Sequence, residues 1–191
     1  MPILFNKNIG SETSLSLWEM SESMDELHAL NIPLPETIKN EKRKKEWICV
    51  RLLLQKIAPN TTISYNKFGA PILSDGRAIS ITHSKEYCCL LISPKKASVD
   101  IEPINEKAHR LKDQFISEKE EKLITQSNTS TLIWCAKECL FKLHQKGNLI
   151  FKEDLKIQTI SEKTIETTLK GNSYLLNFEK FNEHYLVYYY E

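Results

Sequence analysis

The sequence of 191 residues has no long apolar run and almost no net charge. A helix needs about 20 consecutive apolar residues to span a bilayer, and no segment approaches that length. Lysine and arginine number 26 against 25 acidic residues, so overall charge favours neither nucleic acid nor an anionic membrane surface. The first residues show no basic leader followed by a long apolar core, so we expect no secretory signal and a cytoplasmic location.

The five cysteines show neither zinc-site spacing nor a disulfide framework. Their number is odd, and they fall in predicted helices and strands. Cys135 and Cys139 are one helical turn apart, but no second pair accompanies them. We therefore expect buried free thiols, as in a reducing cytoplasm.

No low-complexity tract interrupts the chain. A hydrophobic content of 41% and a charged content of 27% are ordinary for a globular protein. The length suits one sizeable domain or two small, closely packed lobes.

Two carboxylates lie on one face of a predicted strand at residues 98–103. Alternation sends Val99 and Ile101 to one side, and Asp100 and Glu102 to the other. The Cα atoms of the acidic pair would be about 6.5–7 Å apart. At that separation the carboxylates repel each other, and they can also share a hard cation such as Mg²⁺.

A predicted helix further along carries a third carboxylate. Trp134, Glu138 and Lys142 recur every four residues and share a face. An apolar stripe on nearly the opposite side predicts the core face: Leu132, Ala136, Leu140 and Leu143. Glu138, brought beside the strand pair, would complete an all-oxygen Mg²⁺ site.

Spacing alone also fits a simpler interpretation, in which the acidic pair lies on a solvated sheet face. Glu138 and Lys142 would then be an ordinary helix pair with a small stabilising effect. Two features favour a site instead. Trp134 and Phe141 lie on or beside the charged helix face, which indicates that something covers it, and the strand carries no cation near its carboxylates.

The two motifs, in this order and separation, resemble the 4′-phosphopantetheinyl transferases. That family has a G-[IV]-D-[IVL]-E strand and a W-x-x-K-E-[AS]-x-x-K helix. Here Ser98 stands in place of the glycine, Lys137 is kept, and Cys139 stands in place of Ala or Ser. Residues 115–120 resemble the family's F-x-S-x-x-E segment.

The resemblance extends to residues expected to bind coenzyme A. Residues 78–84 resemble an I-S-[IVL]-[ST]-H-S/T segment whose hydroxyl and imidazole meet coenzyme A phosphates, which assigns that role to Thr82 and His83. Arg43 and Arg51 of a predicted helix are further candidates. The alternative for Arg51 is that it snorkels to the surface.

One departure concerns a lysine that contacts coenzyme A in the family. Where the family often has G-K-P, this chain has Gly69-Ala70-Pro71. That contact is therefore missing or supplied by a neighbour such as Lys67.

The resemblance implies an α+β fold, a pseudo-dimer of two similar lobes in which each small antiparallel sheet packs against helices. The turn cluster at residues 93–96 places the boundary between residues 1–95 and 96–191 of a single closely packed unit. A shorter form of the family supplies one lobe per chain and trimerises. The length of this chain favours the two-lobed, surfactin-synthetase-activating type and a monomer.

The local sequence patterns predict these elements. Strands are expected at residues 13–18, 98–103, 155–160, 164–169, 174–181 and 185–190, with a hairpin over 79–92 and, at residues 63–71, a strand that leaves into a turn. Helices are expected from Ser21 to Leu30, at 36–57, at 108–114, after Ser117 with Glu120 as its capping box, and after a cap at 127–130 as far as Gly147.

The implied activity is that of a holo-[acyl-carrier-protein] synthase. The 4′-phosphopantetheine group of coenzyme A would move to a serine of an apo acyl or peptidyl carrier protein, releasing adenosine 3′,5′-bisphosphate. Mg²⁺ on Asp100, Glu102 and Glu138 would offset the developing charge. Glu138 would take the serine proton and Lys142 would contact the phosphate.

Carrier proteins are usually acidic, and Lys112, Lys119 and Lys122 are candidate contacts, although such a run is also typical of a solvated helix face. Two other functions stay open. Another Mg²⁺-dependent nucleotide phosphotransferase would use the same carboxylates without needing the helix motif. A coenzyme A or carrier-protein binder that has lost catalysis is supported by Ser98 and Ala70. Acidic residues are interspersed among the basic ones, which disfavours binding of nucleic acid.

Overall fold

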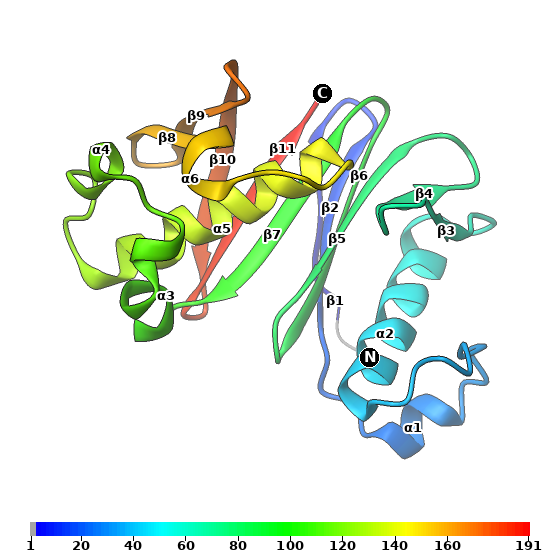
Figure 1. Cartoon of the computed structure of the whole chain (residues 1–191). Helices are drawn as coiled ribbons and strands as arrows, with labels where there is room; N and C mark the ends of the chain where they lie inside the picture. The colour runs from blue at the N-terminus through cyan, green and yellow to red at the C-terminus, as the bar shows by residue number, and fades with distance from the viewer. Residues whose placement is uncertain (1–2) are drawn as a thin grey trace.

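The computed structural model describes residues 3–191 and contains two antiparallel sheets of four and five strands, with a small separate hairpin (Figure 1). The expectation that the chain has no secretory signal includes Met1 and Pro2, which lie outside the described residues. No helix within residues 3–191 is both long enough and apolar enough to cross a membrane.

The N-terminal sheet has the strand order β1-β2-β6-β5. Its strands are β1 (Ile3–Gly10), β2 (Thr13–Glu19), β5 (Ala78–His83) and β6 (Tyr87–Ser93). The chain between β2 and β5 forms helices α1 (Met24–His28) and α2 (Glu41–Ile57) and a hairpin of β3 (Ile63–Tyr65) and β4 (Pro71–Leu73). Helix α2 packs along this sheet through a shared apolar cluster.

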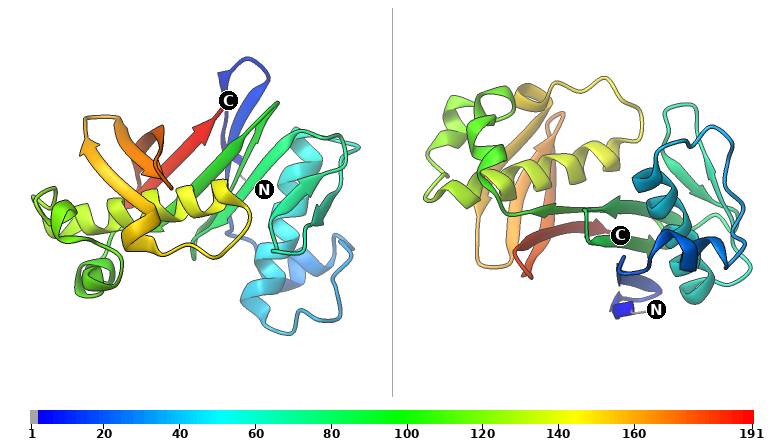
Figure 2. Two further views of the ribbon diagram at one scale, coloured as in Figure 1. Left: turned by 45° about the horizontal axis from the view of Figure 1, so that its top comes forward. Right: turned by 90° about the horizontal axis from the view of Figure 1, so that it is seen from below.

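The C-terminal sheet has the order β7-β11-β10-β9-β8. Its strands are β7 (Ala97–Pro103), β8 (Leu155–Ile160), β9 (Thr164–Leu169), β10 (Asn172–Phe181) and β11 (His184–Tyr190). Between β7 and β8 lie α3 (Glu106–Arg110), a 3₁₀ turn (Lys112–Gln114), α4 (Glu118–Glu121), α5 (Ser127–His144) and α6 (Phe151–Asp154). Helix α5 crosses this sheet, as Figure 2 shows from two sides.

The two sheets meet where their edge strands β5 and β7 run side by side. The backbone N–H of Val99 donates to the Ser80 hydroxyl at 2.9 Å, and that of Ile101 donates to the Thr82 hydroxyl at 3.2 Å. Both bonds advance in the same direction along the two strands, so β5 and β7 are parallel. The hydroxyl oxygens of Ser80 and Thr82 thus accept the outward N–H groups of edge strand β7. In a continuous sheet, backbone carbonyls of the neighbouring strand would accept them.

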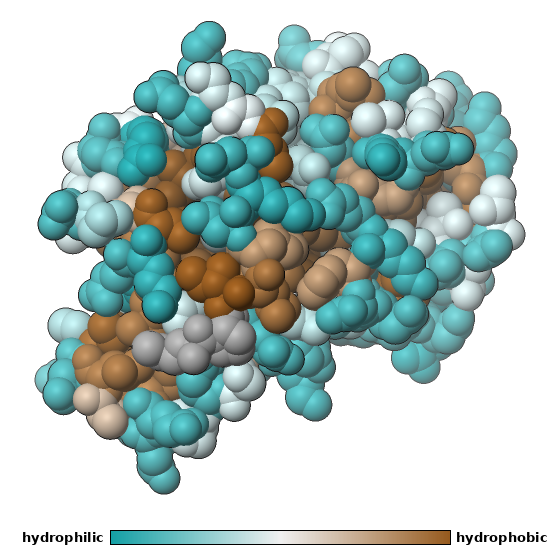
Figure 3. All heavy atoms as spheres, turned by 180° about the vertical axis from the view of Figure 1, so that it is seen from behind, coloured by the Kyte–Doolittle hydropathy of each residue, from teal (hydrophilic) through white to brown (hydrophobic). Residues whose placement is uncertain are grey.

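Three apolar clusters hold these layers together. One lies between α2 and the N-terminal sheet, and a second lies between α5 and the C-terminal sheet. The third is shared by the two sheets and includes Leu15, Leu17, Leu91, Val99 and Leu186. From behind, some hydrophobic atoms reach the surface near the centre of the molecule, surrounded by hydrophilic ones (Figure 3).

This architecture confirms the predicted α+β class and is compatible with a two-lobed pseudo-dimer. The predicted alternation along β7 is confirmed as well. Val99 and Ile101 enter the shared cluster, while Asp100 faces Lys142 of α5. The lobe boundary at residue 95 stays a prediction.

Several element boundaries differ from the predictions because other residues cap the helices. Helix α2 begins at Glu41, since the Asn40 side chain accepts the N–H of Arg43. Ser23, and not Ser21, caps α1 with a capping box to Glu26. The segment 127–130 forms the first turn of α5 and does not precede it.

Strands β1 and β4 were not predicted. The centre of β1 is polar, at residues 6–8, and it pairs on one side only, with β2. The β4 strand has only three residues and begins with a proline. Both strands therefore lack the alternating apolar pattern on which the sequence prediction depends.

A buried ion pair fixes the position of α5. Lys137 is fully buried, and its ammonium lies 2.9 Å from Glu120. It also donates to the carbonyls of Phe115 and Phe151, at 2.6 and 3.0 Å. Glu120 closes the capping box of α4 and accepts the N–H of Ile157 in β8. One ion pair thus joins α4, α5, α6 and β8.

Replacing Lys137 by Met should lower the free energy of unfolding by about 3–5 kcal/mol, because Glu120 is left buried without its cation. Urea denaturation measures this change. The double variant Lys137→Met/Glu120→Gln should recover part of the loss, whereas Lys122→Met, at an exposed site, should change stability by less than about 0.5 kcal/mol. A loss at Lys137 no larger than that at Lys122 would contradict the assigned role.

Candidate active site

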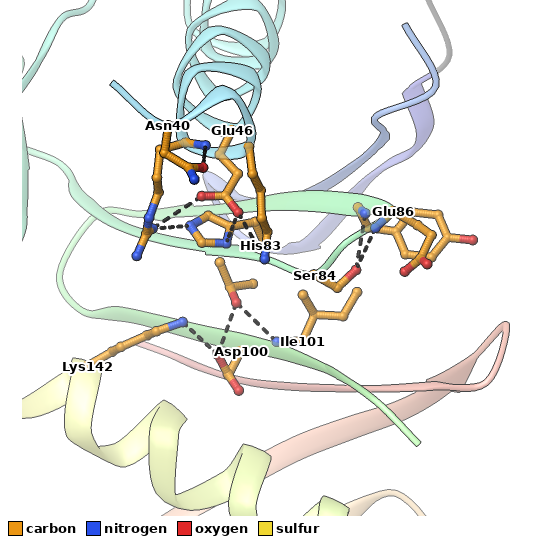
Figure 4. Close-up of polar contacts among 12 residues, drawn as sticks. Asn40, Glu46, His83, Ser84, Glu86, Asp100, Ile101 and Lys142 are labelled. Atoms are coloured by element: carbon orange, nitrogen blue, oxygen red, sulfur yellow. Dashed lines mark hydrogen bonds and ion pairs between the residues drawn. The ribbon is translucent and has the colours of Figure 1, made fainter. Parts of the chain in front are cut away.

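Asp100 is the centre of a polar cluster beneath the contact between the sheets (Figure 4). Its Oδ1 accepts from the Lys142 ammonium at 2.6 Å and from the Thr82 hydroxyl at 3.0 Å. Its Oδ2 is buried and has no hydrogen-bond partner within residues 3–191. A buried carboxylate oxygen without a partner is costly, so this atom needs a cation or a donor from outside the chain.

Two more carboxylates adjoin Asp100. Glu102 accepts from the indole N–H of Trp134 at 3.0 Å. Burial, followed by repulsion from Asp100, raises the pKa of Glu102. The same two effects in the same order raise the pKa of Glu138 to about 7. Each carboxylate is therefore destabilised by its acidic neighbours, which is the electrostatic condition that a bound cation relieves.

The donor set fits a hard divalent cation, although the side chains are not gathered around one point. Within the described part of the chain, no three His, Cys, Asp or Glu side chains are placed to hold a metal ion. The unpartnered Oδ2 of Asp100 and the raised pKa values of Glu102 and Glu138 nevertheless indicate an unmet need for positive charge. Carboxylate oxygens are the ligands that Mg²⁺ prefers.

The Lys142 ammonium makes two hydrogen bonds and has a third N–H group available. Its ammonium donates to the Val99 carbonyl at 3.1 Å and to Asp100. Burial opposes the charge on this amine, but the attraction of Asp100, the hydrogen bond to it and the attraction of Glu138 together raise its pKa above the usual value. An ammonium has three N–H groups, so Lys142 is a permanent cation that can make one more bond.

Ser98 and Cys139, the two departures from the family motifs, contact each other. Ser98 is fully buried in β7, and its hydroxyl donates to the Cys139 backbone carbonyl in α5. The thiol of Cys139 lies 3.3 Å from the same hydroxyl. The Ser98 hydroxyl therefore has its hydrogen-bond partner in α5, and the hydrogen bond between Lys142 and Asp100 is made beside it.

Two adjoining cavities beside this cluster lie between α2 and the end of α5, and together they are called the groove. The first, of about 540 Å³, is lined by residues 37–40, which precede α2, and by Arg51 and other residues. The second, of about 370 Å³, is lined by the 68–71 turn, Lys142 and neighbouring residues of the loop after α5. They share the lining residues Arg43, Tyr65, Ile81 and His83, so the two cavities adjoin each other.

Arg51 lies flat on an aromatic wall of the first cavity. Its guanidinium carbon is 3.1 Å from the centre of the Trp47 ring, and its Nη2 donates to the Tyr65 hydroxyl at 3.4 Å. No ion pair to Arg51 occurs within residues 3–191. The side chain neither snorkels away from the protein nor is neutralised by a carboxylate, and its charge faces the cavity.

His83 ends β5 in the wall shared by both cavities. Its Nδ1 lies 3.3 Å from the Glu46 carboxylate of α2, and its Nε2 lies 3.4 Å from the Arg43 guanidinium. Burial lowers the pKa of His83, partly offset by Glu46. Figure 4 shows the imidazole directly beneath Glu46.

The structure thus separates the predicted site residues into two adjoining groups. The cationic groove holds Arg43, Arg51, His83 and Lys142. The acidic cluster holds Asp100, Glu102 and Glu138. Thr82 is not among the lining residues of the two cavities, and its single hydroxyl hydrogen is donated to Asp100. Ala70 lines the second cavity, whereas the ammonium of Lys67 lies over the Phe68 ring, 5.1 Å from its centre.

Glu46 was missed in the sequence, although it is buried in the groove wall. It pairs with Lys42 and Arg43, four and three residues earlier in α2. That spacing is the signal that could have been used, but on a helix it usually indicates only an exposed ion pair. Its contact with His83 joins segments 37 residues apart and could not be read from the spacing.

The raised pKa of Glu138 predicts how stability depends on pH. In the folded protein this pKa is about 7 instead of the ordinary 4.5, so the fold binds more protons between those values and stability falls as the pH rises through that window. Glu138→Gln, which stays neutral, should be about 1–3 kcal/mol more stable than the wild type at pH 8 and equal to it at pH 4. Urea denaturation at the two pH values tests this, and an equal difference at both would refute it.

The comparisons with known proteins concern the second half of the chain. No curated protein matches the sequence. Residues 98–189 match the family described as the ACPS 4′-phosphopantetheinyl transferase superfamily. This segment runs from β7 into β11 and contains all three acidic residues and Lys142. Residues 98–189 of this chain are therefore similar to the 4′-phosphopantetheinyl transferase superfamily.

Proposed function

We propose that the protein transfers the 4′-phosphopantetheine group of coenzyme A to a serine of an apo acyl or peptidyl carrier protein, as a holo-[acyl-carrier-protein] synthase. The observation that carries this proposal is the position of Lys142, which is bonded to Asp100 of the acidic cluster and also lines the cationic groove. This arrangement suits a substrate whose phosphate groups bind in the cationic groove while one of its phosphorus atoms reacts beside the acidic cluster. The superfamily match of residues 98–189 supports the same reaction class.

The groove is the proposed site for the nucleotide half of coenzyme A. Arg43, Arg51 and His83 offer donors to phosphate oxygens, and Asn40, the N-cap of α2, lines the first cavity at the positive end of the helix dipole. The aromatic rings of Trp47 and Tyr65 provide an apolar wall. The missing lysine at Ala70 is offset by Arg43 and Lys142, which line the same cavity.

The reaction is a displacement at phosphorus. The carrier serine oxygen bonds to the phosphorus that bears the pantetheine arm, the bond from that phosphorus to the bridging oxygen breaks, and adenosine 3′,5′-bisphosphate leaves. The free N–H of Lys142 is placed to donate to a phosphate oxygen as negative charge develops. Thr82 holds Asp100 in position through its hydroxyl and is a positioning residue in this scheme.

Glu138 is the proposed base. Its carboxylate lies at the edge of the acidic cluster, one helical turn from Lys142, and could take the proton of the carrier serine directly or through a metal-bound water as the oxygen attacks. Mg²⁺, held by Asp100, Glu102 and Glu138, would neutralise the mutual repulsion of the carboxylates and the charge of the diphosphate.

The carrier protein is proposed to approach beside Glu102. A cavity of about 340 Å³ there is lined by Leu111, Phe115, Trp134 and other residues. Leu111 is 39% exposed, so an apolar contact is available next to the acidic cluster. Of the three candidate lysines, Lys112 is engaged by Glu121 at 2.8 Å, while Lys119 and Lys122 are exposed and remain for an acidic partner.

The two-lobed type, a monomeric state and a cytoplasmic location are proposed on the same basis. One chain supplies both walls of the groove, so no second copy is needed to complete it. A binder that has lost catalysis is less well supported. The Ser98 hydroxyl, which stands in place of the family's glycine, is hydrogen-bonded to α5, and the hydrogen bond between Lys142 and Asp100 is still made.

Intact-mass spectrometry of an apo acyl carrier protein, incubated with this protein, coenzyme A and Mg²⁺, tests the proposal. We expect a gain equal to one phosphopantetheine group. The gain should be lost with EDTA and strongly reduced with Glu138→Gln, because the cation and the base are then removed. Coenzyme A binding without any gain on several carrier proteins would favour the non-catalytic binder. Neither binding nor gain would reject the proposal.

Lys142→Met should lower kcat about 10²–10³-fold with a smaller effect on KM for coenzyme A, because it removes a charged donor that acts most strongly as charge develops. Steady-state kinetics with a fixed carrier protein measure both constants. Lys146→Met, in the exposed loop after α5, is the matched control and should retain wild-type rates. A pure rise in KM for Lys142→Met would show that the ammonium only binds the nucleotide.

A further inference from the structure

Glu46 occupies an unusual place in the groove wall. Its side chain is only 5% exposed, although it belongs to the first half of α2, where the neighbouring charged side chains of Lys42 and Arg43 are each 66% exposed. Its Oε1 faces Nδ1 of His83 at 3.3 Å, and its Oε2 accepts from the Arg43 guanidinium at 3.2 Å. One carboxylate therefore contacts two of the groups that face the groove.

The contact between Glu46 and Nδ1 determines which nitrogen of His83 carries the hydrogen in the neutral imidazole. A carboxylate beside Nδ1 favours the tautomer in which Nδ1 carries the hydrogen. In neutral His83 the other nitrogen, Nε2, then has a lone pair, which accepts from the Arg43 guanidinium at 3.4 Å in the wall of the groove. A lone pair repels a phosphate oxygen, whereas a protonated Nε2 would donate to it.

Burial, followed by two neighbouring cations, favours the neutral form of His83 over the charged one. The groups that face it are Glu46 and Arg43 of α2, and Lys142 of α5. Burial lowers the pKa of His83, Glu46 raises it, and the two cations lower it. A phosphate in the groove would add negative charge on the Nε2 side and would reverse the balance.

We propose that Glu46 is a positioning residue that presents Nε2 of His83 and the guanidinium of Arg43 to a phosphate of the nucleotide donor, and that donor binding is coupled to uptake of a proton by His83. This inference rests on the proposed function, since it takes coenzyme A as the ligand of the groove. It adds the carboxylate that organises the phosphate contacts and a proton that accompanies binding.

A merely structural role for Glu46 leads to a different expectation. If the carboxylate only balanced Lys42 and Arg43, its replacement would change stability and leave the proton count of ligand binding unaltered. Proton linkage is therefore the readout that separates the two roles. Affinity should fall as the pH rises through the window between the free and the ligand-bound pKa of His83, because binding takes up a proton there.

Titration calorimetry of the intact protein with coenzyme A at pH 7.0, in buffers of different ionisation enthalpy, measures the protons taken up. We expect net uptake by the wild type, with Kd increasing between pH 7.0 and pH 8.5. Glu46→Gln should bind about tenfold more weakly, since a hydrogen bond to a charged group is lost, and its proton uptake should be much reduced. His83→Asn should lose the uptake while Glu46 is still present.

Glu41→Gln is the matched control, because Glu41 lies in the first turn of the same helix and, within residues 3–191, pairs only with Lys44. It should bind coenzyme A as the wild type does. Thermal unfolding of each variant without ligand establishes that the fold is retained. If Glu46→Gln is unstable, the His83→Asn variant and the NMR titration of His83 in wild-type protein, with and without coenzyme A, still decide the question.

Equal affinity and equal proton uptake in wild type and Glu46→Gln would overturn the inference, as would an unchanged pKa of His83 on binding. The carrier-protein transfer assay on the same samples separates this failure from failure of the proposed function. Normal transfer with no proton linkage would reject only the inference. A wild-type protein that neither binds coenzyme A nor modifies a carrier protein would reject both.

Discussion

The position of β7 against β5 is the constraint on which the rest of the structure depends. Ser80 and Thr82 accept the outward N–H groups of Val99 and Ile101, and so they join the edge strands of two sheets that also share an apolar cluster and polar contacts such as the Lys7–Glu179 ion pair. Unlike a backbone ladder, this contact requires two particular side chains. It places α2 and the end of α5 on opposite sides of one groove.

The same contact also organises the acidic cluster. Thr82 accepts from β7 and donates to Asp100, so one hydroxyl sets both the spacing of the sheets and the direction of a carboxylate. Lys142 completes the arrangement from α5, and the Lys137–Glu120 pair fixes that helix from its other side. The residues with chemical roles are therefore held by elements from both halves of the chain.

The sequence was most informative where periodicity and chemistry coincide. Alternation along β7 and the four-residue spacing in α5 placed Asp100, Glu138 and Lys142 correctly with respect to their faces, and the hairpin of β5 and β6 and the last four strands were predicted well. Helix starts were less accurate, because Asn40 and Ser23 compete with nearby polar residues as caps. Roles that depend on contacts between distant segments, such as Glu46 with His83, leave no periodic signal. Thr82 illustrates the same limit, because only the structure reveals that its hydroxyl is engaged.

The groove has two unlike walls that come from a single chain. One wall carries Arg43, Arg51 and His83, and the other carries Lys142 next to the carboxylates. In this chain each wall is encoded separately. The affinity for the nucleotide and the reactivity of the phosphorus can therefore diverge independently during evolution, one through α2 and the other through α5.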